Sequence, residues 1–195
     1  ARFVQSGLSY RTLIRSVVTS DTYRQAITAN SAAEKIDSGN TLLWRQNRRK
    51  LEAEALRDAI LAVSGKLDLT MGGPGWQDFV IEQPEHSPHY LYDRHDPSDS
   101  KTFRRSVYRF IVRSQTQPWM TSLDCADPSM RVDRRTESLS PVQALALLNN
   151  GFLLTQAEFL ARRVASDRDV IGEQVQHAFR LSLSRKPDSE ESNTL

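Results

Sequence analysis

Residues 51–66, LEAEALRDAILAVSGK, decide the fold, because they carry the clearest helical pattern in the chain. Apolar side chains recur there every three or four positions, which gathers them along one side of a helix. The stripe consists of Leu51, Ala55, Ala59 and Ala62 or Val63, with Leu56 and Ile60 beside it. Gly65 suits the left-handed position that ends many helices. The pattern predicts a helix that opens at Asn40 or Thr41, is uninterrupted over residues 48–64 and ends at Gly65.

Four further helices are predicted from capping residues and apolar stripes. Ser9 is a good N-cap for the first of them. Ser140 followed by Pro141 gives an N-cap with proline at the first helical position, and Pro187 ends the last helix. The predicted ranges are residues 10–19, 141–149, 152–164 and 170–183.

The middle of the chain has weaker patterns and more helix-breaking residues. Residues 28–40 are polar and predict a loop, and residues 71–75, MGGPG, cannot continue a helix. Residues 105–113, RSVYRFIVR, fit both the periodicity of a helix and the alternation of a strand. Their β-branched and aromatic content favours a strand. Short strands are also predicted at residues 79–82 and 90–92.

These elements predict a mainly α fold, a helical bundle-like domain with long loops and a small irregular β element in its middle. We expect a single domain over residues 1–195, with a loop-rich insert over residues 70–139. A long loop over residues 117–139 ends this insert. Both ends suggest a fragment of a longer protein, since the chain starts without Met and stops in a polar stretch.

The composition excludes several classes of protein. With 195 residues, 38% hydrophobic and 26% charged, the chain is long enough and apolar enough to bury a core. A net charge of +2, from 26 basic and 24 acidic side chains, gives no basis for nucleic-acid binding. No apolar run approaches the roughly 18 residues of a membrane span. Cys125 is the single cysteine, which excludes an internal disulfide and a cysteine-based zinc cluster.

Residues 85–97, EHSPHYLYDRHDP, contain three of the four histidines and are the candidate metal site. Imidazole and carboxylate groups are suitable ligands for zinc and other first-row metals. The candidate ligands are His86, His89, Asp93 and His95. Pro88 interrupts the pattern, however, so the histidines do not form the helical pair that holds a metal rigidly. We therefore favour a structural loop whose histidines make hydrogen bonds, and keep the metal or catalytic site as the alternative.

Arginines and one tryptophan form the candidate ligand-binding set. Arg105, Arg109 and Arg113 recur every four residues, and Trp119 follows them. Such groups suit an acidic glycan or a phosphate, with the aromatic ring stacking on a sugar. The chain also supplies counter-charges, among them Glu54, so ion pairing is the interpretation we favour.

Two other motifs have plain structural interpretations. Asp124 and Asp127 flank Cys125, and their charges would raise the pKa of its thiol, which argues against a cysteine nucleophile. The glycines of MGGPGW follow a helix and lack the continuation of a phosphate-binding loop, so a flexible turn explains them.

Three long motifs together resemble one family: LLWRQNRRKLEAEALRDAILAVSGKLDLTMGGP, FRRSVYRFIVRSQTQPWMTSLDCADPS and SLSPVQALALLNN. It is the C-terminal domain of unknown function 1553 of planctomycete multidomain proteins, which commonly accompany a cytochrome c domain. The resemblance implies an exported or periplasmic protein, with domains upstream that include one of unknown function 1549. It also implies haem in an upstream segment and none in this chain, which has no C-x-x-C-H motif. It supplies no catalytic residues.

Two functions follow from these observations. The first is a non-catalytic structural or interaction module of an exported, c-type cytochrome-associated protein, with the upstream domains of the same polypeptide as partners. The alternative is a part of a hydrolytic or oxidative enzyme acting on polysaccharide, with the histidine and aspartate loop as its site. Carbohydrate is a candidate partner besides the upstream domains.

Overall fold

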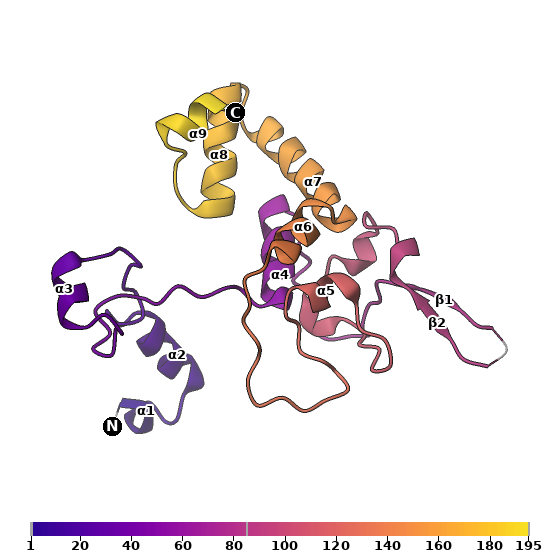
Figure 1. Cartoon of the computed structure of the whole chain (residues 1–195), viewed down its shortest axis with the longest axis horizontal. Helices are drawn as coiled ribbons and strands as arrows, with labels where there is room; N and C mark the ends of the chain where they lie inside the picture. Colours follow the sequence, from indigo (N-terminus) through magenta and orange to yellow (C-terminus); the bar gives the residue numbers. More distant parts are fainter. Residues whose placement is uncertain (1, 85, 195) are drawn as a thin grey trace. The chain divides into compact units, whose positions relative to one another are not determined.

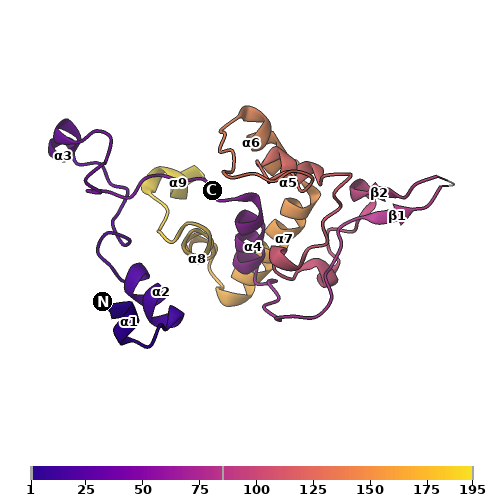
Figure 2. The same cartoon turned by 90° about the horizontal axis from the view of Figure 1, so that it is seen from below.

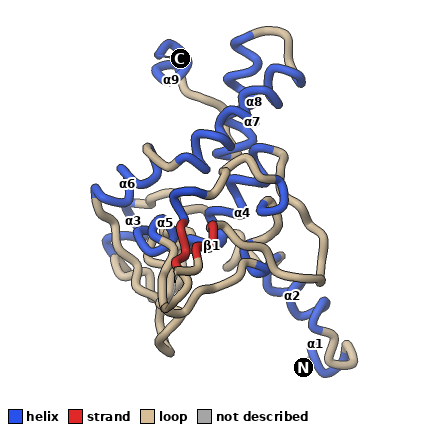
Figure 3. The backbone as a smooth tube through the Cα atoms, turned by 90° about the vertical axis from the view of Figure 1, so that its right-hand side faces the viewer, coloured by secondary structure: helices blue, strands red, loops and turns tan. Residues whose placement is uncertain are grey.

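The computed structural model describes residues 2–84 and 86–194, which divide into two compact units (Figure 1). Residues 1–50 form the N-terminal unit, and residues 51–195 form the C-terminal unit. Helices dominate, and the strands of the described residues are confined to one short hairpin, shown in red in Figure 3. The predicted mainly α fold is confirmed, while the single domain expected for the whole chain stays a prediction.

The N-terminal unit consists of three short helices joined by turns. They are α1 (Arg2–Gln5), α2 (Tyr10–Val18) and α3 (Ser31–Ile36). The side chain of Ser9 accepts a hydrogen bond from the backbone N–H of Thr12 at 3.4 Å, so the predicted N-cap and its helix are confirmed.

Two features of this unit correct the sequence prediction. Residues 28–40 are not a loop throughout, because Asn30 accepts two backbone N–H groups of the first turn of α3, at 3.1 and 3.2 Å. Asn40 does not open a long helix. It is buried, has a φ of +56°, and its Nδ2 donates to the carbonyl oxygen of Arg45 at 2.7 Å. Residues 41–52 therefore lie outside any helix.

In the C-terminal unit, α4 (Ala53–Ser64) packs against α7 (Gly151–Asp167), as Figures 1 and 2 both show. Gly65 ends α4 with a φ of +77°, which confirms the predicted C-cap. The predicted buried stripe is wrong, because Leu51 and Ala55 are exposed. The helix instead buries Ala53, Arg57, Leu61 and Ser64.

Four other helices complete this unit. They are α5 (Pro118–Ser122), α6 (Pro141–Leu148), α8 (Ile171–Leu183) and α9 (Ser189–Thr194). The helices predicted near α6, α7 and α8 are confirmed, and Ser140 caps α6 as expected. The predicted loop over residues 117–139 is wrong at its start, since Gln117 caps α5 by accepting the N–H of Met120 at 2.6 Å. Within the described residues, no helix has the length and apolar character needed to cross a bilayer.

The core of the C-terminal unit lies where α4, α5 and α6 meet the start of α7. Its buried members are Ala53, Trp119, Met120 and Leu123. On α6, the side that faces this core is opposite a second apolar stripe, which is exposed. That stripe consists of Val142, Leu145 and Leu148, and Leu139, just before the helix, is exposed as well. Only one side of this helix is therefore covered within the C-terminal unit.

An antiparallel hairpin joins β1 (Val80–Glu82) to β2 (His89–Leu91) and extends away from α4 and α7 in Figures 1 and 2. Ile81 pairs with Tyr90, so both predicted strands are confirmed. Phe79 anchors the hairpin, because it is buried and meets the ring of Tyr90 edge-on at 5.1 Å.

The strand predicted over residues 105–113 is wrong. Ser106–Tyr108 form a 3-10 turn, η3, and Asp58 of α4 fixes it by accepting both the N–H and the hydroxyl of Ser106 at 2.7 Å. This segment pairs with the end of the glycine-rich loop (residues 71–76) rather than with a strand. Trp76 donates its backbone N–H to the carbonyl oxygen of Tyr108 at 3.0 Å. Gly75 permits this approach, since a Cβ there would lie 2.9 Å from the same oxygen.

We expect Gly75→Ala to lower the free energy of unfolding by about 1–3 kcal/mol, because the added methyl group meets backbone that cannot yield without moving the loop. Urea denaturation followed by circular dichroism measures this change. Gly172→Ala on α8 is the matched control, because a Cβ there meets open space and alanine favours a helix. Equal stability of the two variants would contradict the packing at Gly75.

Candidate ligand-binding cavity

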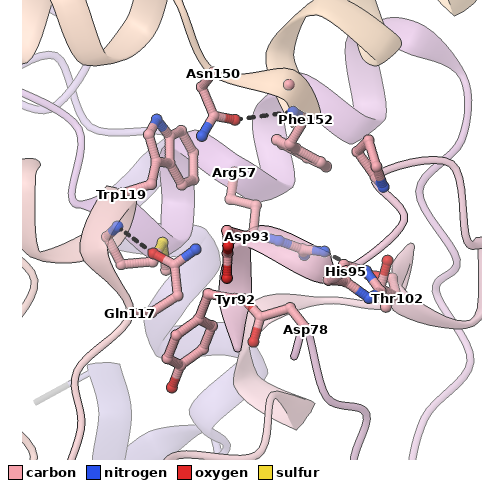
Figure 4. Close-up of a pocket in the computed structure, with 13 residues that line it drawn as sticks. Arg57, Asp78, Tyr92, Asp93, His95, Thr102, Gln117, Trp119, Asn150 and Phe152 are labelled. Carbon is pink, nitrogen blue, oxygen red and sulfur yellow. Dashed lines mark hydrogen bonds between the residues drawn. The ribbon is translucent and has the colours of Figure 1, made fainter. Parts of the chain in front are cut away.

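A cavity of about 270 Å³ lies between α4, α5, the start of α7 and the segment that follows β2; we call it the central cavity (Figure 4). Its lining combines aromatic rings with charged and amide side chains. The principal ones are Arg57, Asp78, Tyr92, Asp93, His95, Gln117, Trp119, Asn150 and Phe152. Tyr92 and Asp93 belong to a 3-10 turn, η1 (Tyr92–Arg94), so the turn directly after the hairpin forms one wall.

Arg57 enters the cavity from α4 and is only 5% exposed. Its guanidinium donates to the backbone carbonyl oxygens of Thr102 and Arg104, the latter at 3.1 Å. It also lies over the rings of Trp76 and Phe152, at 4.1 and 5.1 Å from the centroids. Burial lowers the pKa of Arg57 to about 10, although Asp78 and Asp58 oppose that shift. The group is still a cation at neutral pH.

Asp78 forms a largely buried ion pair with Arg109. Nε of Arg109 lies 3.0 and 3.1 Å from the two carboxylate oxygens, and the side chains are 9% and 16% exposed. A pair this dry and close leaves little net charge. Asp78 therefore contributes to the wall as half of an ion pair rather than as a free carboxylate.

Four polar side chains keep hydrogen-bonding capacity toward the cavity. Asp93 and His95 make no hydrogen bond or ion pair with any residue that the structure describes. Gln117 and Asn150 use their amide oxygens as helix caps for α5 and α7. Their amide nitrogens have no acceptor within the described part of the chain. The cavity therefore offers two amide donors, a carboxylate acceptor and an imidazole.

Aromatic rings form the apolar part of the lining. Trp119 and Phe152 pack with their centroids 5.8 Å apart, and the hydroxyl of Tyr92 donates to the carbonyl oxygen of Gln115 at 3.1 Å. The rings come from α5, from the first turn of α7 and from η1, so three separate elements hold them in place. Rings and unused polar groups together suit a small ligand with both apolar and hydroxyl-bearing surfaces.

The four candidate metal ligands are only partly brought together. Asp93 and His95 line the central cavity, whereas His89 is exposed on β2 opposite Glu82, and His86 lies in the turn between the strands. Among the described residues, no group of three or more His, Cys, Asp or Glu side chains is placed to hold a metal ion. A metal site in this segment stays a prediction.

The candidate arginine set is not one surface either. Trp119 lines the central cavity and Arg109 pairs with Asp78, but Arg105 contributes a backbone carbonyl, which accepts from Trp76 Nε1 at 3.2 Å. Arg113 is exposed, and its Nε lies 3.4 Å from the carbonyl oxygen of Pro128. Sequence reasoning missed Arg57, Asp78, Gln117 and Asn150. Asn150 alone left a local signal, an asparagine directly before a helical stretch.

The environment of Cys125 agrees with the expected unreactive thiol, although the acid that acts on it is not the one predicted. Burial raises its pKa to about 11, and the second cause is Glu54, whose Oε1 lies 3.6 Å from the sulfur. Asp124, which was expected to act on the thiol, instead accepts hydrogen bonds from Ser138 and Gln143. Glu54 also forms an ion pair with Arg135, with 2.6 Å between Oε2 and Nη1.

Comparison with known proteins places the chain in a family. A family model described as PSD1, protein of unknown function (DUF1553), matches residues 1–195. No curated protein and no solved structure matches the chain.

We expect Arg57→Met to lower the free energy of unfolding by roughly 3 kcal/mol, because the carbonyl oxygens of Thr102 and Arg104 lose buried donors. Urea denaturation measures the loss. Arg162→Met is the control, since that side chain is 74% exposed and has only surface contacts among the described residues, an ion pair with Glu158 and a distant approach to the ring of Phe159. It should change stability by less than about 0.5 kcal/mol. Similar losses in both variants would show that Arg57 is not a structural anchor.

We expect Glu54→Gln to speed alkylation of Cys125 at pH 8, because removing the neighbouring negative charge lowers the thiol pKa. The wild-type thiol, with a pKa of about 11, should be only roughly 0.1% thiolate at that pH and should react slowly. Mass spectrometry after timed iodoacetamide treatment gives the rates. Glu52→Gln is the control, since Glu52 pairs with Arg135 at 3.6 Å and is not among the causes of the thiol's pKa shift. Wild-type alkylation as fast as that of free cysteine would contradict this environment.

Proposed function

The chain belongs to the PSD1 family (DUF1553), as its motifs predicted, and from this premise we propose that it is a non-catalytic carbohydrate-binding module. In this proposal the central cavity holds one neutral sugar ring. The module is part of an exported or periplasmic multidomain protein associated with a c-type cytochrome, and its protein partners are the upstream domains. The resemblance alone supports the location, the cytochrome and the partners.

One observation carries the binding proposal: the central cavity places three aromatic rings beside four polar side chains with unused hydrogen-bonding capacity. A sugar ring has apolar C–H faces that pack on aromatic rings, and a rim of hydroxyls that both donate and accept. The two amide nitrogens of Gln117 and Asn150 suit hydroxyl oxygens as acceptors. The carboxylate of Asp93 can accept hydrogen bonds from sugar hydroxyls. The ring of His95 can donate to a hydroxyl or accept from one, depending on its tautomer.

The charges of the cavity favour a neutral ligand over an anion. Arg57 donates to two backbone carbonyls and has the Asp58 carboxylate 3.8 Å away as its counter-charge, while Asp78 neutralises the nearby Arg109. Asp93 remains as an unpaired carboxylate on the rim and would repel an anionic group. This balance supports a neutral sugar in place of the acidic glycan or phosphate considered from the sequence.

The same arrangement supports binding without hydrolysis. Glycoside hydrolysis ordinarily needs two carboxyl groups, one to donate a proton and one to act as base or nucleophile. Both oxygens of Asp78 accept from Arg109, which leaves Asp93 as the one unpaired carboxyl among the described lining residues of this cavity. The enzymatic alternative therefore has less support from the geometry.

A panel of methyl glycosides of common neutral hexoses and pentoses, titrated into labelled protein by NMR, tests the proposal. We expect at least one to saturate with a Kd on the order of 1 mM, a usual affinity for one small polar ring. Asp93→Asn and His95→Ala should weaken that binding about fivefold without changing the melting temperature, because neither side chain makes a hydrogen bond or ion pair within the described structure.

His89→Ala is the matched control, since this histidine lies on the same segment but lines none of the cavities described here. It should bind like the wild type. The absence of saturable shifts with every glycoside would refute carbohydrate binding in the central cavity. Release of shorter products from a matching oligosaccharide, lost in Asp93→Asn, would instead support the enzymatic alternative.

A further inference from the structure

Two further cavities adjoin the central one. The first, of about 560 Å³, is bounded by the glycine-rich loop and residues 99–104, and we call it the loop cavity. The second, of about 180 Å³, lies beside Arg109 and Arg135, and we call it the arginine cavity. Each shares lining residues with the central cavity, so neither is an isolated surface hollow.

The three cavities adjoin where they share lining residues, one at the first boundary and three at the second. His95 lines both the central and the loop cavity. Tyr92, Gln117 and Met120 line both the central and the arginine cavity. The order is therefore loop cavity, central cavity, arginine cavity, and the segment from Tyr92 to His95 borders all of them.

Lining residues of neighbouring cavities contact one another, which fixes the positions of the three cavities. The guanidinium of Arg57 in the central cavity lies 4.1 Å from the ring centroid of Trp76, which lines the loop cavity. Asp78 in the central cavity pairs with Arg109, which lines the arginine cavity. These contacts are buried, so the spacing between neighbouring cavities is set by packed groups rather than by a mobile loop.

We infer that the three cavities form one continuous site for a linear neutral oligosaccharide, with successive sugar units in neighbouring cavities. This inference rests on the proposed function, because it extends the single sugar of the central cavity to a chain. Trp76 and Phe79 give the loop cavity aromatic surface of its own. Tyr92 lines the arginine cavity as well as the central one, so each of the three cavities has an aromatic ring in its wall. Adjoining cavities with aromatic rings suit a polymer of sugar rings.

The charges of the outer cavities indicate the class of polymer. The loop cavity has Asp68 and Asp99 beside Lys101 and Arg104. The arginine cavity has two acids, Glu54 and Asp127, beside two arginines, Arg109 and Arg135. A polyanion would meet a carboxylate for every cation, whereas a neutral chain of hydroxyls finds donors and acceptors in each cavity.

Calorimetric titration of the full chain with cello-, manno- and xylo-oligosaccharides of one to six units tests this inference. For the series whose monosaccharide binds best, we expect Kd to fall at least tenfold between one and three units and then to level off. A Kd independent of length would overturn the inference while leaving the single-sugar proposal intact. No binding at any length would overturn both.

Variants in the outer cavities localise the effect. Gln77→Ala in the loop cavity and Thr116→Val in the arginine cavity alter exposed side chains without a hydrogen bond to any described residue. Each should weaken trisaccharide binding three- to tenfold and leave monosaccharide binding unchanged. Gln176→Ala, exposed on α8, should change neither.

Unchanged trisaccharide binding in both cavity variants would overturn the continuous site. Oligogalacturonate, a linear polyanion of sugar rings, serves as the charge control. Binding of its trimer as tight as that of the best neutral trimer would overturn the assignment to neutral chains. An extended peptide of glycine and serine is the second control, and equally tight binding of that peptide would overturn the carbohydrate class.

Discussion

The buried guanidinium of Arg57 is the contact on which the C-terminal unit depends. It projects from α4, donates to the carbonyl oxygens of Thr102 and Arg104, and stacks on the rings of Trp76 and Phe152. One side chain thus joins α4 to the irregular middle of the chain and to the first turn of α7. A lysine could not replace it, because a single ammonium lacks the planar face and the divergent donors that these four contacts use.

The irregular middle segment is held mainly by side chains that bind backbone, in place of a sheet. Arg104 donates to the carbonyl oxygens of Thr70, Gly72 and Pro74, and the hydroxyl of Tyr108 accepts the N–H of Gly72. Such bonds satisfy backbone groups that a strand would pair in a ladder. They also fix the loop in one position, which is why the cavities beside it have defined walls.

Local signals explain which parts of the fold were predictable from the sequence. Ser9, Ser140 and Gly65 mark helix ends through bonds within a few residues, and all three were assigned correctly. The inner face of α4 was not, because hydrophobic periodicity assumes an apolar buried side and this helix buries Arg57 and Ser64. The strand prediction for residues 105–113 was wrong for a similar reason. Its aromatic and β-branched residues suit a strand, but distant Asp58 fixes it as a turn.

The residues of the candidate site also divide into those that the sequence indicated and those that it did not. Trp119, Asp93 and His95 were candidates because their residue types stand out in the sequence, although they were assigned to different sites. Arg57 and Asp78 gave no such signal, since their role arises from contacts with residues tens of positions away. The buried bond between Ser64 and Gln156, at 2.7 Å, is another contact of this kind, and it joins α4 to α7 on the polar inner face.

The lining of the central cavity therefore has two kinds of residue with different constraints. Arg57, Trp119 and Phe152 belong to the packing of the helices, so any substitution there changes stability together with the shape of the cavity. Asp93 and His95 make no bonds within the described structure and are exposed or half-buried, so they can change at little structural cost. A site built in this way fixes the size and apolar faces of its ligand through the fold. It leaves the choice among ligands of that size to the few rim side chains that the fold does not need.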